Sequence, residues 1–184
     1  MRASANRLPE TEGYVLTTTD SRRASEPMCA LDPLLLIPRI EHVEDVYDWV
    51  LAAAEDYCLV ILDIKNFHVI NDIYNYDTGD AVIVQFVRGL RRRLPQGSIT
   101  LRFRHGDEFL FFVPGEAAQT ESVFRTFRDF CEATPALTVA QQDIFVSFRF
   151  AAMNLGRSNE SVRMVLANAE KALREVKGQG SPRA

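Results

Sequence analysis

The chain has 184 residues, of which 47% are hydrophobic and 25% are charged, and its formal net charge at pH 7 is −4. These values are typical of one globular domain with its own core, and the negative balance argues against a nucleic-acid surface, which needs a basic face. No apolar run approaches the ~20 residues of a membrane span and the N-terminus lacks a hydrophobic signal core, so we expect a cytoplasmic protein without a membrane span.

Residues 1–29 are rich in Ser, Thr, Arg, Glu and Pro and contain few large apolar side chains. This composition is typical of a mobile tail, because such a segment cannot bury enough apolar surface to fold. We therefore predict a tail over 1–29 and a single domain over 30–184. Cys58 and Cys131 lie within apolar patterns, which favours buried thiols over disulfides or metal ligands.

Hydrophobic periodicity predicts an ordered series of helices and strands in this domain. In chain order these are a helix from Glu41, a buried strand over 58–62, a short helix over 66–74, a helix opened by Gly79-Asp80, strands over 99–103 and 109–113, a helix over 119–131, strands over 137–139 and 144–151, and a last helix over 162–177. The mixture predicts an α/β (α+β) fold, with a central, mostly antiparallel sheet flanked by helices.

A tight turn at 104–109 carries two adjacent carboxylates, Asp107 and Glu108, between two of the predicted strands, and a third carboxylate, Asp63, ends the strand over 58–62. Oxygen donors on strand ends and turns suit Mg²⁺ on a triphosphate, since hard cations take oxygen ligands. A Gly-Asp hairpin turn beside an unrelated helix-capping Asp would give the same pattern. Taken alone, the turn favours this simpler interpretation.

Several segments strengthen the first interpretation when they are considered together. They are Asp32-Pro33-Leu34 with Pro38, the run 62–72 (L-D-I-K-N-F-H-V-I-N-D), Gly79-Asp80, the H-G-D-E-F at 105–109, and the run 169–177. In this order and spacing they resemble the GGDEF family, the diguanylate cyclases and their degenerate relatives. The resemblance covers roughly residue 31 to the C-terminus and implies the ferredoxin-like palm fold of nucleotide cyclases.

The resemblance also implies a site for Mg²⁺, or Mn²⁺, and GTP. Family members hold two Mg²⁺ ions on the triphosphate, and the 3′-hydroxyl of one GTP attacks the α-phosphorus of another. On this chain the implied metal ligands are Asp63, the Ile64 carbonyl, Asp107 and Glu108. The same resemblance implies that the catalytic residues are Asp63, Asp107 and Glu108. It also implies that the residues in contact with the substrate are Asn71, Asp80, Gly106, His68 and Lys177.

The resemblance further implies that Asn71 and Asp80 are the residues that bind the guanine base. A carboxylate there accepts from N1 and N2 of guanine and rejects adenine, which offers no such donors. Without the resemblance, Asn71 would be interpreted as a helix-surface amide and Asp80 as an acid near a helix N-terminus, where the dipole favours it.

Departures from the family pattern gather on the phosphate side. Either His105 replaces the first glycine of the signature or that glycine is deleted, and both registers remain open. In the gap-free register Phe103 holds the family's arginine position. The other departures are His68 for a lysine, Lys65 for the second acid of D-x-D, Asn75-Tyr76 for a Gly-His pair, Ser181 for a phosphate-binding arginine, and Gln-Gly-Ser-Ile at 96–99 in place of the R-x-x-D product-inhibition motif.

These departures favour a divergent Mg–GTP-binding regulatory domain of cyclic di-GMP signalling, with weak or no cyclase activity. The alternative is an active diguanylate cyclase that condenses two GTP as a homodimer and lacks R-x-x-D product inhibition. The expected partners are GTP, a second copy of the chain or a regulatory protein, and no nucleic acid.

Overall fold

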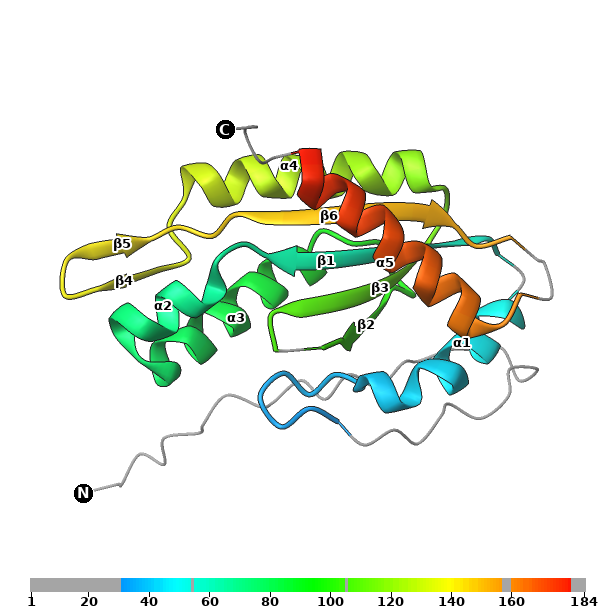
Figure 1. The fold of residues 1–184 in the computed structure, drawn as a ribbon, viewed down its shortest axis with the longest axis horizontal. Helices are drawn as coiled ribbons and strands as arrows, with labels where there is room; N and C mark the ends of the chain where they lie inside the picture. The colour runs from blue at the N-terminus through cyan, green and yellow to red at the C-terminus, as the bar shows by residue number, and fades with distance from the viewer. Residues whose placement is uncertain (1–30, 54, 105, 157–159, 180–184) are drawn as a thin grey trace, which may run out of the picture.

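The structure, a computed structural model, describes residues 31–53, 55–104, 106–156 and 160–179. The predictions for the tail over 1–29, for His105 and for Ser181 fall outside these ranges. The helices and strands are shown in Figure 1 and are, in chain order, η1 (Ile40–His42), α1 (Val43–Leu51), β1 (Tyr57–Ile64), α2 (Phe67–Tyr74), α3 (Tyr76–Arg91), β2 (Ile99–Arg102), β3 (Glu108–Pro114), α4 (Ala117–Ala133), β4 (Leu137–Val139), β5 (Gln142–Ile144), β6 (Phe148–Asn154) and α5 (Val162–Gln179).

The central sheet has the strand order β2-β3-β1-β6, and all three neighbouring pairs are antiparallel. Helices α2 and α3 connect β1 to β2, and α4 leads from β3 toward β6, which is the β-α-β-β-α-β order of a ferredoxin-like fold. The predicted fold class is therefore confirmed. The strands β4 and β5 form a separate hairpin that extends beyond the sheet (Figure 1).

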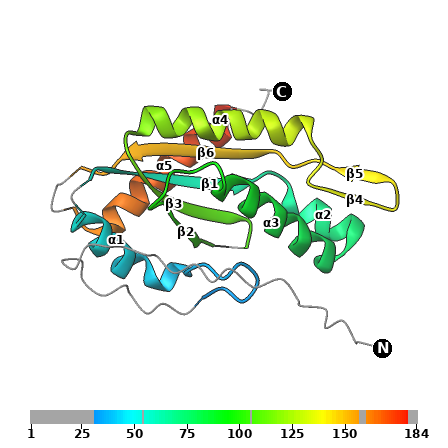
Figure 2. The same cartoon turned by 180° about the vertical axis from the view of Figure 1, so that it is seen from behind.

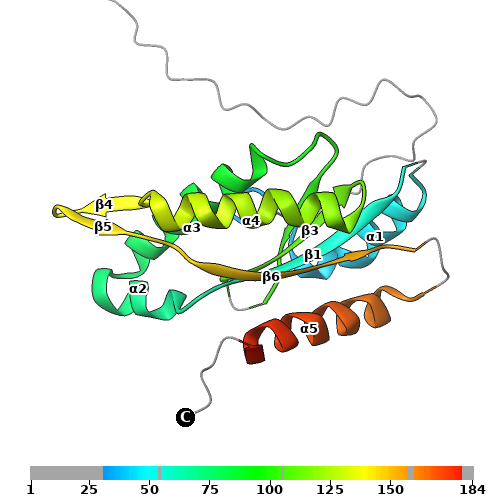
Figure 3. The same ribbon diagram turned by 90° about the horizontal axis from the view of Figure 1, so that it is seen from above.

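Strand β1 is buried on both faces because it lies between β3 and β6 and has helices on either side. Leu59 and Ile61 belong to the core beneath α1 and α5, whereas Val60 and Leu62 belong to the core beneath α3 and α4. Helix α5 crosses the near face of the sheet in Figure 1, and α3 lies in front of the sheet in the reverse view of Figure 2. Figure 3 shows α4 and α5 on opposite faces of the sheet. Each fully buried Leu or Ile side chain contributes roughly 1.5–3 kcal/mol of transfer free energy.

The run 144–151, predicted as one strand, is divided in the structure: Ile144 ends β5, and residues 148–151 lie in β6. Burial at every second position continues through the break, at Ile144, Val146, Phe148 and Phe150. Hydrophobic alternation therefore could not reveal that the chain changes its partner strand from β4 to β1.

The helix predicted to open at Gly79-Asp80 begins earlier, at Tyr76. Asn75 caps it, since its side chain accepts a hydrogen bond from the backbone N–H of Thr78 at 2.9 Å. Asn75 has a φ of +98°, a conformation that glycine adopts without strain. The positive φ explains why a glycine suits this position. For the asparagine, the capping hydrogen bond offsets the strain of that backbone conformation.

Both predicted buried thiols are confirmed: Cys58 and Cys131 are free and buried. Burial raises the pKa of Cys131 to about 11, which keeps that thiol protonated at neutral pH. Within the described ranges, no helix combines the length and the apolar character that crossing a membrane requires.

Candidate functional site

Two acidic side chains face each other across the central strands. Asp63 on β1 and Glu108 on β3 are register partners, and the neighbouring pair is joined by a hydrogen bond from Ile64 N to Asp107 O at 3.1 Å. Alternation then makes Asp63 and Glu108 a non-hydrogen-bonded pair, in which Cα atoms approach to about 4.5 Å. Two like charges at such a pair are destabilising unless a cation lies between them.

That cation is Lys177, from the last turns of α5. Its Nζ donates to Asp63 Oδ1 at 2.7 Å and lies 3.5 Å from Glu108 Oε1. The side chains are only partly exposed, at 33% for Lys177, 14% for Asp63 and 18% for Glu108. Helix α5 therefore brings a positive charge to the point where two carboxylates converge.

The pKa of Glu108 is raised above its ordinary value. Burial is the largest cause, and the negative charges of Asp63 and Asp107 add to it, while Lys177 acts in the opposite direction. Because both aspartates act on the same carboxyl group, all three acidic side chains gather at this end of the sheet.

This donor chemistry fits a hard divalent cation, since carboxylate oxygens are the ligands that Mg²⁺ and Mn²⁺ prefer. Among the described residues, however, no three His, Cys, Asp or Glu side chains are already arranged to hold a metal ion. The ammonium group of Lys177 occupies the point on which Asp63 and Glu108 converge. A metal ion would have to displace this ammonium group.

Arg102 stabilises the turn at 104–109 through hydrogen bonds to its backbone. Its Nε and Nη2 donate to the carbonyl oxygen of Gly106 at 3.2 and 2.9 Å, and its Nη1 donates to Asp32 Oδ2 at 3.0 Å. Asp32 is buried and also accepts from the backbone N–H groups of Leu34 and Leu35. Arg102 therefore links the Asp32-Pro33-Leu34 segment to the turn that carries Asp107.

The sequence pattern did not reveal Arg102, because the family's arginine position falls one residue later in the gap-free register. Phe103, at the family's arginine position in the gap-free register, is buried in the core. Gly106 has a φ of +82°, in the left-handed region that favours glycine. The usable signal was a pairing of Asp32 with an arginine near the turn, but 70 residues separate the two.

The predicted guanine-reading residues lie where α2 meets α3. Asn71 is half-buried on α2, and its Oδ1 is buried without a hydrogen-bond partner in the described part of the chain. Asp80 is exposed on α3, next to Gly79, which packs against Asn71. A buried acceptor without a partner is costly, and a donor on a ligand would satisfy it.

Gly79→Ala is expected to destabilise this region, because a Cβ at Gly79 would collide with Asn71 Oδ1 and crowd the Phe67 ring at 3.2 Å. We expect a loss of roughly 1–3 kcal/mol in the free energy of unfolding, measured by urea denaturation. Gly178→Ala is the matched control, since nothing lies within 4 Å of its added Cβ. A Gly79→Ala protein as stable as the control would contradict the expected collision.

His68, the remaining predicted substrate contact, is exposed on α2. It makes no hydrogen bond or ion pair with any residue that the structure describes. Its role stays a prediction, whereas Asp63, Glu108 and Lys177 are in direct contact with one another.

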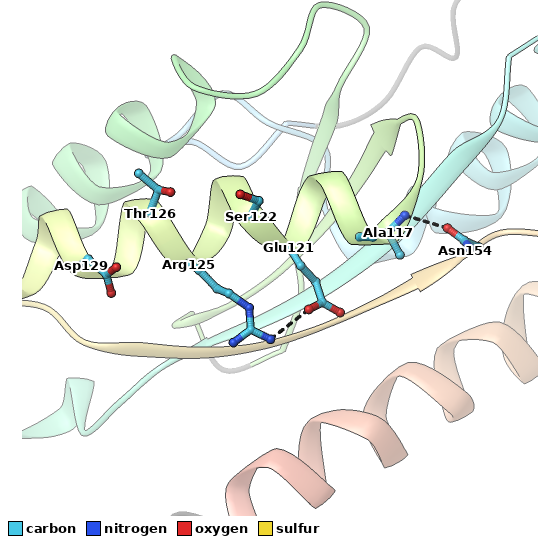
Figure 4. Close-up of a pocket in the computed structure, with 8 residues that line it drawn as sticks. Ala117, Glu121, Ser122, Arg125, Thr126, Asp129 and Asn154 are labelled. Atoms are coloured by element: carbon cyan, nitrogen blue, oxygen red, sulfur yellow. Dashed lines mark hydrogen bonds and ion pairs between the residues drawn. The ribbon is translucent and has the colours of Figure 1, made fainter.

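A more open hollow on the described surface lies elsewhere. It has a volume of about 530 Å³ and follows the outer side of α4, where Arg125 pairs with Glu121 and Asn154 accepts from the backbone of Ala117 (Figure 4). Its lining contains none of the predicted site residues. A smaller hollow of about 160 Å³ is lined by Glu108 and Lys177, and the chemistry of its lining makes it the better candidate.

The sequence profile of the family described as "Diguanylate cyclase, GGDEF domain" matches residues 41–183. The chain belongs to the GGDEF family. The diguanylate cyclase DgcM of Escherichia coli K12 is 30% identical over 138 residues, which are 72% of this chain and 31% of DgcM. The chain thus spans about a third of the length of that relative.

Solved GGDEF structures share the fold. The GGDEF domain of DgcB from Caulobacter crescentus, in complex with c-di-GMP, is 24% identical with a TM-score of 0.70, and covers 89% of this chain and 94% of that one. The diguanylate cyclase SiaD of Pseudomonas aeruginosa, in complex with its activator SiaC, is 22% identical with a TM-score of 0.72, and covers 82% and 58%. The predicted family and fold are therefore confirmed together.

Proposed function

We propose that this GGDEF domain binds GTP with a divalent metal ion and acts as a divergent regulatory domain of cyclic di-GMP signalling, with weak or no cyclase activity. The observation that carries the proposal is the contact of Lys177 with both Asp63 and Glu108. It supports a site at which two carboxylates and one lysine meet a highly charged ligand.

Each residue has a distinct task in this proposal. The bound metal ion supplies a Lewis acid that neutralises phosphate charge. Its holders would be Asp63, Asp107, Glu108 and the Ile64 carbonyl. Asn71 and Asp80 bind the guanine edge, and Lys177 exchanges its carboxylate partners for a phosphate oxygen when the nucleotide arrives.

The altered phosphate positions are the reason for expecting weak activity. His68 and Ser181 stand at positions where the family pattern has basic residues. A charge-assisted hydrogen bond is worth roughly 1.5–3 kcal/mol, so two lost contacts weaken GTP binding by one or more orders of magnitude. The cyclisation rate falls as well where such contacts tighten in the transition state.

An active homodimeric cyclase is the second candidate, and it is favoured by the intact metal and guanine positions, Asp63, Asp107, Asn71 and Asp80. Chromatography after incubating concentrated protein with GTP and Mg²⁺ or Mn²⁺ separates the two. If the amount of cyclic di-GMP formed does not exceed the amount of protein, the divergent domain is supported. Many turnovers per hour support the cyclase.

Isothermal titration calorimetry tests the proposal itself. We expect GTP to bind with micromolar to millimolar affinity when Mg²⁺ is present, more weakly after the metal is chelated, and more tightly than ATP. A protein that binds no GTP in the presence of metal, or binds GTP and ATP equally, would show that the proposed site does not exist.

Lys177→Met is expected to separate metal binding from nucleotide binding. Removing the ammonium group should tighten Mn²⁺ binding without nucleotide about tenfold, because the metal no longer competes with it. The same change should weaken GTP binding about tenfold through the lost phosphate contact. Electron paramagnetic resonance of free Mn²⁺ measures the first effect, and calorimetry measures the second.

The matched control for this variant is Lys171→Met, because Lys171 is exposed on the same helix. It should change neither affinity. If Lys177→Met leaves both affinities unchanged as well, the lysine has no part in either binding event.

A further inference from the structure

A row of charged residues crosses three strands of the sheet. Asp63 on β1 is the register partner of Glu108 on β3 and also of Arg149 on β6. Directly opposed residues of antiparallel strands project to the same face, so Arg149 lies on the face that α5 covers, with Asp63 and Glu108.

Arg149 lies close to the acidic pair along the backbone. Lys65 N donates to Ser147 O at 2.8 Å, which makes that pair hydrogen-bonded, and alternation makes Asp63 and Arg149 hydrogen-bonded as well. The Cα atoms of such a pair are about 5.5 Å apart. An arginine side chain is long enough to reach the space above the end of β1 from a position this close.

The described neighbours of Arg149 do not provide an acceptor for the buried part of its guanidinium group. Its Nε is buried without a hydrogen-bond partner, and no ion pair to Arg149 occurs within the described part of the chain. The adjacent Asp63 carboxylate is bonded to Lys177 instead. Leaving a buried N–H of a charged group without an acceptor costs roughly 1–3 kcal/mol or more, and an acceptor atom on a bound ligand would recover that free energy.

A phosphate group supplies acceptors of the kind that the Arg149 guanidinium group lacks within the described chain. A guanidinium presents a planar fork of donors that phosphate oxygens can accept in pairs. The chain has lost cations elsewhere on the phosphate side, since Ser181 and His68 replace basic residues of the family pattern. Lys177 and Arg149 would then bind the triphosphate from α5 and from β6.

We propose that Arg149 is a phosphate-binding residue of the nucleotide site, donating to non-bridging oxygens of the β- or γ-phosphate of GTP. This inference rests on the proposed function, because it assumes that GTP binds beside Asp63 and Glu108. It explains how the chain retains a triphosphate with so many altered positions, and it predicts that the contact distinguishes GTP from GMP.

The test measures affinities of the full chain for GTP and GMP by calorimetry, with Ca²⁺ present in place of Mg²⁺ so that turnover does not interfere. Arg149→Ala should weaken GTP binding about 10- to 100-fold and leave GMP binding within about twofold. Arg149→Lys should recover part of the loss, because a lysine keeps the charge but lacks the fork.

Arg163→Ala serves as the charge-matched control. Arg163 is exposed in the first turn of α5, 14 residues and thus about 21 Å from Lys177 along the helix axis. Its removal should leave both affinities unchanged. Thermal unfolding of each variant verifies folding, and Arg149→Lys decides the question if Arg149→Ala does not fold.

The outcomes separate this inference from the proposed function. Unchanged GTP affinity in both Arg149 variants overturns the inference and leaves the proposed function standing. Equal weakening of GTP and GMP also overturns it, since that result means a structural role for Arg149. A wild-type chain that binds no GTP overturns both together.

Discussion

Asp63→Asn is expected to remove metal-dependent GTP binding, with a fall in affinity of about 100-fold or more. The asparagine keeps the shape of the side chain but removes a negative charge from the point where Lys177 and Glu108 meet. A unit charge near a divalent ion is worth several kcal/mol at the effective dielectric constant of a protein surface, so one lost carboxylate ligand is a large loss. Calorimetry with GTP, with and without Mg²⁺, measures it.

Stability should respond far less than binding to this change. The Asp63–Lys177 pair is partly exposed, so its loss costs about 1 kcal/mol or less. Asp129→Asn on the outer side of α4 is the matched control and should leave GTP affinity unchanged. If Asp63→Asn binds GTP as the control does, the metal ligands lie elsewhere.

Arg102→Ala is expected to lower the free energy of unfolding by about 3 kcal/mol. The substitution leaves the Asp32 carboxylate, whose side chain is only 5% exposed, without its closest cation, and it removes two bonds to the Gly106 carbonyl. Breaking one side of a buried ion pair costs about 3–5 kcal/mol. We take the lower end because two backbone N–H groups still bind Asp32. For a chain of this size, the melting temperature should fall by roughly 6–12 °C.

Chemical denaturation of Arg102→Ala, Asp32→Asn and the double variant forms a cycle that isolates the pair itself. Arg125→Ala is the control, since that arginine makes an exposed i,i+4 pair with Glu121 and should cost about 0.5 kcal/mol or less. An Arg102→Ala protein as stable as the control would mean that Arg102 does not hold the turn.

Local sequence signals correctly predicted the elements whose partners follow from their own pattern. The buried strand at 58–62 lies within β1, and the hairpin at the signature turn joins β2 to β3. Local sequence signals did not predict the β4–β5 turn, because its residues are not the types that usually adopt a positive φ. Ala140 and Gln141 form the two-residue turn of the β4–β5 hairpin with positive φ values of 49° and 67°, yet neither is the Gly or Asn that marks such turns.

The sequence by itself determined the family and the sheet's apolar strands, because hydrophobic periodicity and motif order depend on residues that are close along the chain. Only the tertiary structure decided which charges meet. Lys177 reaches Asp63 from 114 positions away, Arg102 reaches Asp32 from 70 positions away, and Arg149 lies beside Asp63 only because β6 pairs with β1. Such contacts depend on strand register and helix placement, which are set by packing of the whole core and leave no local pattern in the sequence.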